Sequence, residues 1–82
     1  MKFIVEFRLK PGKKNQAVDL FEQRGPNRIS GVSFRSAWIG AHADIAFVLV
    51  ESADETTVRA AANSWGAIGD ADITQVIDVE QF

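Results

Sequence analysis

The first residues of the chain alternate between side chains suited to opposite faces of a β-strand. Residues 2–10 read KFIVEFRLK, and every second residue from Phe3 to Leu9 is apolar. The residues between them, which share the other face, are Ile4, Glu6 and Arg8. A period of two residues is typical of a strand, so we expect one here, ended by Pro11-Gly12.

Two stretches have the spacing of amphipathic helices. In residues 13–24 apolar side chains recur at helical spacing, and Gly25-Pro26 then supplies a stop signal. The second helix is expected after Ser52, which stands in capping-box spacing with Glu55, while Asp54 is a rival N-cap. Its apolar stripe is Val58, Ala61, Ala62 and Trp65, and Gly66 and Gly69 are expected to end it.

Three more stretches have the character of strands. Residues 45–51 are apolar on both faces until Glu51, and residues 72–80 alternate again. Residues 32–39 also suit a pleated sheet. Their alternation places Val32, Phe34, Ser36 and Trp38 on one face and Ser33, Arg35, Ala37 and Ile39 on the other. Because only residues 40–44 separate two of these strands, we expect an antiparallel hairpin.

This order of elements predicts an α+β fold of the ferredoxin-like βαββαβ type, in one domain over residues 1–82. Such a fold has a four-stranded antiparallel sheet with two helices on one face, and the other face is open. Because residues 45–50 offer apolar side chains to both sides, one set must lie on the open face. We therefore expect a homodimer that forms through the open sheet faces.

Composition supports self-association and excludes several partners. A chain of 82 residues can bury only a marginal hydrophobic core by itself, and without cysteine it has no disulfides to add stability. The formal charge of −2 argues against a nucleic-acid partner. The longest apolar run, residues 45–50, is too short to span a bilayer, and Glu6 and Arg8 interrupt any signal peptide. We therefore expect a cytoplasmic protein without a membrane partner.

Four marks of the chain together suggest a known family. They are Lys10-Pro11-Gly12, Trp38 late in the second strand, Val50-Glu51, and SWGAIGDADITQV from Ser64 to Val76. With these marks the chain resembles a small bacterial family, domain of unknown function 3303, within the dimeric α+β barrel superfamily. Relatives often read W-x-D-L-x-D-F-E before a proline, where this chain has Gly66 to Asp72 after Trp65 and Gln75 at the proline position. The resemblance implies two sheets that face each other across a twofold axis, and no established activity.

His42, the only histidine, is the most obvious candidate for chemistry. It lies in the stretch SAWIGAHAD, residues 36–44. An imidazole can serve as a catalytic base or a metal ligand, but the chain has no cysteine or second histidine to share a transition metal. No serine lies in a G-x-S-x-G elbow. We therefore interpret the stretch as a hairpin tip with His42 facing solvent, and keep a place at a pocket rim as the alternative.

Five further residues are candidates for a ligand site. Trp38 and Trp65 are expected in the core, with an indole that lines a cavity as the alternative. Glu6, Arg8 and Arg35 share the parity of the open face, and two guanidinium groups with one carboxylate would leave a positive remainder. These charges form either an interfacial ion-pair network or an anion-binding pocket.

Two functions of different class remain open at this point. In the first, the protein is non-enzymatic or regulatory and binds a small apolar or aromatic acid in the barrel interior. In the second, suggested by the superfamily alone, it is a cofactor-independent monooxygenase or isomerase acting on a small aromatic substrate. We favour the first because no convincing acid–base pair is visible in the sequence. No metal or organic cofactor is expected, since there is neither a Gly-rich phosphate loop nor a dinucleotide fingerprint.

Overall fold

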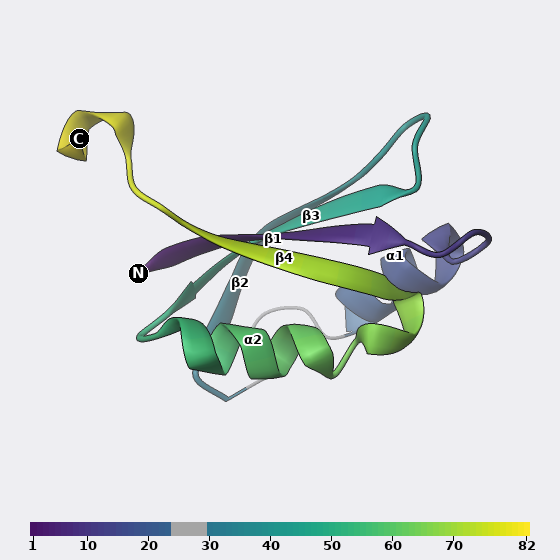
Figure 1. The fold of residues 1–82 in the computed structure, drawn as a ribbon, viewed down its shortest axis with the longest axis horizontal. Coiled ribbons are helices and arrows are strands. Elements are labelled where there is room, and N and C mark those ends of the chain that lie inside the picture. Colours follow the sequence, from purple (N-terminus) through teal and green to yellow (C-terminus); the bar gives the residue numbers. More distant parts are fainter. Residues whose placement is uncertain (24–29) are drawn as a thin grey trace.

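Four strands form one antiparallel sheet, and two helices lie against one of its faces (Figure 1). The computed structural model describes residues 1–23 and 30–82. Its elements are β1 (Lys2–Leu9), α1 (Lys14–Gln23), β2 (Val32–Ile39), β3 (Ile45–Ser52), α2 (Glu55–Asn63) and β4 (Gly69–Val76), with 3₁₀ turns at Gly66–Ile68 and Val79–Gln81. The stop signal expected at Gly25-Pro26 lies outside the described residues.

The strands lie in the order β2-β3-β1-β4, and all neighbours are antiparallel. This order, with both helices on one side, is the ferredoxin-like α+β arrangement, so the predicted fold is confirmed. The central strands β1 and β3 pair Ile4 with Leu49 and Val5 with Val48. Because side chains alternate along each strand, this register shows for each residue of β1 and β3 whether it lies on the helix side or on the open side of the sheet.

The hydrophobic core lies between the sheet and the helices. From β1 it receives Phe3, Val5, Phe7 and Leu9, the residues that the sequence alternation placed together. Trp65 follows α2, and its ring centroid lies 5.7 Å from that of Phe7 and 5.3 Å from that of Phe34. Since Trp65 is only 3% exposed, it is a core residue.

Asp54 is the N-cap of α2, and Ser52 is the last residue of β3. The Asp54 carboxylate accepts a hydrogen bond from the backbone N–H of Thr57 at 2.7 Å and another from the Thr57 hydroxyl at 2.9 Å. Because these bonds favour the ionised form, they hold the pKa of Asp54 below its ordinary value. The rival candidate in the sequence therefore caps the helix.

The last strand differs from the expected one in position. The alternation predicted a strand over residues 72–80, whereas β4 begins at Gly69 and ends at Val76. Lys2, the first residue of β1, pairs with Val76, so β1 offers no further strand residue to pair with Ile77. The helix α2 ends at Asn63, three residues before Gly66, and Gly66 begins the 3₁₀ turn that leads into β4. A strand requires a neighbour as well as an alternating pattern.

Candidate functional site

A β-bulge in β2 decides which of its residues lie on the open face, the face of the sheet opposite the helices. Phe34 pairs with Val50 and Ser36 with Leu49, so Arg35 is the extra residue. One extra residue transfers every later side chain to the other face. The expected faces of residues 36–39 were therefore wrong. Trp38 pairs with Phe47 on the open face, and Ile39 lies on the helix side.

The middle of the open face is apolar. Ile4 of β1 pairs with Leu49 of β3, and Phe47 of β3 pairs with Trp38 of β2. Ile4, Phe47 and Leu49 are half-buried in the single chain, whereas Trp38 is 52% exposed. These four residues, called the apolar centre below, are neighbours on one face and form a partly exposed apolar surface. Such a surface is typical of contact with a ligand or a partner.

Two arginines flank the apolar centre, and each meets a carboxylate of its own sheet. Arg8 donates a hydrogen bond to Asp72 of β4, and Arg35 donates one to Glu51 of β3 at 2.9 Å. The expected net positive charge on the open face was therefore wrong, because sequence reasoning had counted only Glu6 as a partner of the two arginines. Glu51 could have been found, since it shares the parity of Phe47 and Leu49. Asp72 could be found as the partner of Arg8 only from the register of β4 against β1.

The ion pairs shift the pKa of Glu51 and that of Arg8. The hydrogen bond from Arg35 is the main cause that lowers the pKa of Glu51, and the charge of Lys2 adds to it. The hydrogen bond to Asp72 raises the pKa of Arg8 above its ordinary value. Because a guanidinium has five N–H donors, a single carboxylate contact leaves donors for a ligand. The open face can therefore still bind an anion at its margins.

Glu6 is an acid placed between the apolar centre and the charged margin. The register pairs it with Phe47 on one side and with Asp72 on the other. Its side chain is half-buried, and its charge contributes to the raised pKa of Arg8. A carboxylate in this position could orient a bound molecule or accept a proton from it.

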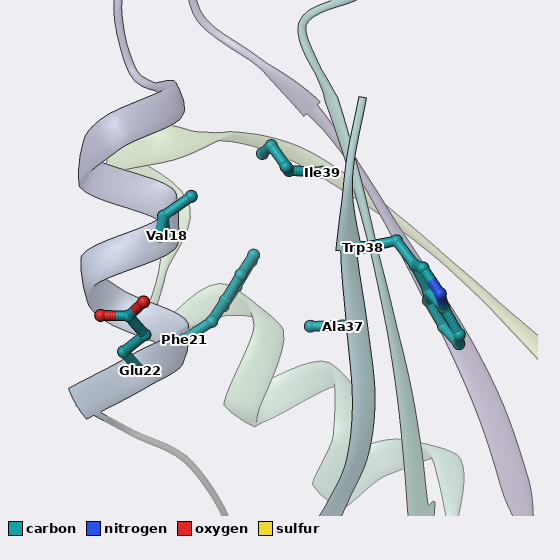
Figure 2. A pocket seen from close by; sticks show the side chains of 6 residues that line it. All are labelled: Val18, Phe21, Glu22, Ala37, Trp38 and Ile39. Atoms are coloured by element: carbon teal, nitrogen blue, oxygen red, sulfur yellow. The ribbon is translucent and has the colours of Figure 1, made fainter. Parts of the chain in front are cut away.

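A hollow of about 300 Å³ opens on the helix side, between α1 and the end of β2. In Figure 2, Val18, Phe21 and Ile39 turn toward this hollow, whereas Trp38 points to the opposite side of the sheet. Among the described residues that line the hollow, Glu22 alone carries a charge. The hollow therefore provides apolar contact but little that would orient a ligand.

The structure brings together four of the six candidate site residues. All four lie on the open face: Trp38 belongs to the apolar centre, and Glu6, Arg8 and Arg35 lie around it. His42 lies exposed in the turn between β2 and β3, and Trp65 lies in the core. Sequence reasoning did not single out Phe47 and Leu49, because it could not tell which alternate set of β3 faces the helices.

The described residues also bear on metal binding and on membranes. Within residues 1–23 and 30–82, no group of three or more His, Cys, Asp or Glu side chains is placed to hold a metal ion. No helix in the same ranges is long and apolar enough to cross a membrane. The absence of an organic cofactor stays a prediction.

The fold and its open face define a small ferredoxin-like α+β domain. Residues 1–82 match the family described as "Domain of unknown function (DUF3303)". The chain therefore belongs to this family, as the four sequence marks predicted. No curated protein and no solved structure matches the chain. The family defines no activity, so function must be argued from the open face.

Proposed function

We propose that the protein is a non-enzymatic or regulatory homodimer that binds a small apolar or aromatic acid between its two open sheet faces. The observation that carries the proposal is the apolar centre, which the single chain leaves uncovered beside Arg8 and Arg35. Ligand sites combine apolar walls with a few oriented polar groups. A second copy would supply the opposite wall, because the open face alone is not an enclosed site.

The size of the open face is sufficient for a dimer, although only barely. Each strand has eight residues, so the sheet measures about 26 by 19 Å. Its flat footprint is about 500 Å² per copy, or about 1,000 Å² for two copies, which is the lower limit for a specific interface. Side-chain relief and any contact beyond the strands would increase this area.

One pair of opposite charges on the open face, Lys2 and Glu51, would meet between the copies across a suitable axis. A twofold axis that runs along the strands between β1 and β3 would place β1 of one copy over β3 of the other. Because Lys2 pairs with Glu51 and Ile4 with Leu49 within one sheet, the same residues would meet between copies. Lys2 of one copy would then face Glu51 of the other, and Ile4 would stack on Leu49. An axis across the strands would instead bring Arg8 of one copy toward Lys2 of the other, and the repulsion between these two positive charges disfavours that arrangement.

The dimer is tested by Leu49→Asp. We expect the wild-type chain to sediment as a dimer at 100 μM and Leu49→Asp to sediment as a monomer, because the variant would bury an unpaired carboxylate between two apolar centres. Thr56→Asp is the matched control. It adds the same charge at an exposed position of α2, far from the open face, and should leave the dimer intact. A wild-type monomer at this concentration would contradict the proposal.

The acid-binding part of the proposal rests on Arg35. Its contact to Glu51 uses Nη2, and the planar guanidinium can bind a second carboxylate through its other N–H groups. A lysine keeps the charge and loses this fork. We therefore expect Arg35→Lys to lower the affinity for an aromatic carboxylate by about tenfold while the protein stays dimeric. Arg59→Lys is the control, because Arg59 pairs with Glu55 on the exposed side of α2.

The measurement is a thermal-shift screen followed by titration calorimetry. Phenylacetate and benzoate serve as the acids, and benzyl alcohol serves as the neutral comparison. Equal affinity of wild type and Arg35→Lys for the acids, or equal affinity of wild type for acid and alcohol, would contradict acid recognition by Arg35. Binding that is lost in Ala37→Leu instead would place the ligand in the hollow beside α1.

An enzymatic function is the second candidate, and Glu6 is the observation that favours it. A half-buried carboxylate beside Phe47 could act as a general base in a cofactor-independent monooxygenase or isomerase. The same screen separates the two functions. Turnover of a bound acid by wild type, lost in Glu6→Gln while binding remains, would replace the non-enzymatic proposal with this one.

A further inference from the structure

The last six residues of the chain form a folded segment with exposed apolar side chains. This segment, Ile77 to Phe82, is called the C-terminal arm below. Ile77 is 54% exposed, Val79 is 88% exposed and Phe82 is fully exposed. Single exposed apolar residues are common at protein surfaces, but three within one six-residue segment call for a partner.

The C-terminal arm has a defined conformation despite this exposure. The side chain of Asp78 and that of Gln81 cap each other's backbone around the 3₁₀ turn Val79–Gln81. The ammonium group of Lys2 also lies 3.2 Å from the Asp78 carboxylate, which ties the arm to the start of β1. The arm is therefore folded, and its apolar side chains are exposed rather than packed onto the domain.

The arm does not pack on its own sheet. A hollow of about 380 Å³ separates it from the margin of the sheet, and polar side chains such as Glu51, Gln75 and Gln81 contribute to its walls. In Figure 1 the arm rises on the side of the sheet opposite α2, where the open face lies. It therefore stands at the edge of the surface through which we propose the dimer to form.

We propose that the C-terminal arm clasps a second copy of this chain at the margin of the sheet interface. The inference rests on the proposed dimer and deepens it. The flat sheet reaches only the lower limit of a specific interface, at about 1,000 Å² for two copies. Two arms would add their apolar side chains to the buried area. Each arm thereby supplies contact that the strands alone lack.

The placement of the arm on the second copy follows from the proposed twofold axis. An axis along the strands lays β4 of one copy over β2 of the other, so the arm that follows β4 reaches the end where β2 begins. Arg35 lies toward this end, in the first half of β2. The arm carries two acids, Asp78 and Glu80, and no base. Because Lys2 already holds Asp78, Glu80 is the acid of the arm that is left to face the second copy.

The test substitutes Val79→Asp and Phe82→Asp and measures the dimer dissociation constant by sedimentation equilibrium. Each variant should raise this constant at least tenfold, because it would force a carboxylate into the apolar contact of both arms. Val79→Leu should keep the wild-type constant. Thr56→Asp is again the control for added charge and should match wild type.

The structural readout separates a contact between copies from a role within one chain. Val79 and Phe82 are so exposed that their substitution removes little packing from their own chain. We therefore expect unchanged circular dichroism and an unchanged melting temperature at concentrations where wild type is also monomeric. Suppose that wild type is a dimer and that Val79→Asp and Phe82→Asp have the same dissociation constant as wild type and Thr56→Asp. The arm inference is then wrong, and the dimer proposal stands. If wild type is monomeric at 100 μM, both fail.

Discussion

At the scale of single residues, Gly69 allows β4 to join the sheet. Gly69 pairs with Leu9, and a β-carbon at Gly69 would lie 2.9 Å from the α-carbon of Leu9 and closer still to the carbonyl oxygen of Arg8. The obstacle is backbone of the central strand β1, which cannot turn aside as a flexible side chain can. The strand that carries Asp72 to Arg8 therefore depends on the absence of a side chain at one position.

Gly69→Ala should lower the free energy of unfolding by about 1–3 kcal/mol, the usual range for local strain and overpacking. Gly66→Ala is the matched control, because a β-carbon at Gly66 meets nothing within 4 Å. The control should change stability by less than 1 kcal/mol, roughly the size of a glycine-to-alanine effect on the unfolded chain. Urea unfolding of both variants measures the difference. Equal stability of the two variants would contradict this prediction and would show that the backbone of β1 and β4 shifts to accommodate the β-carbon.

At the scale of elements, the sequence predicted the number, type and order of helices and strands. The alternation of β1 is regular, and the turn after it contains Pro11 and Gly12, so this assignment needed only local information. The N-cap of α2 is also decided locally. The sequence offered Ser52 and Asp54, and Asp54 is the N-cap because its carboxylate accepts both hydrogen bonds from Thr57.

The faces of β2 could not be predicted in the same way. The bulge at Arg35 lies among Ser33, Phe34 and Ser36, without the glycine that often marks such an irregularity. Only the pairing of β2 with β3 reveals the extra residue. As a result, Trp38 lies on the open face, where the alternation had placed Ile39. The site was predictable in the parity of β1, where Glu6 and Arg8 lie, and unpredictable beyond the bulge.

At the scale of the whole molecule, the two tryptophans report on different surfaces. Trp65 is 3% exposed in the core, and Trp38 is 52% exposed on the open face. A homodimer through the open faces would remove water from Trp38 and leave Trp65 unchanged. Indole emission moves to shorter wavelength when water is removed, so the spectrum of the intact protein can follow assembly.

We expect the emission of the wild-type protein to shift to longer wavelength on dilution below the dissociation constant, because Trp38 then returns to water. Trp38→Phe should abolish this dependence on concentration, since the remaining Trp65 is buried in both states. Leu49→Asp should show the long-wavelength spectrum at every concentration. If sedimentation shows a dimer while the emission of wild type does not change on dilution, Trp38 lies outside the interface. The two copies must then meet through another surface, and the open face with its arginines would be free to bind a ligand without a second copy.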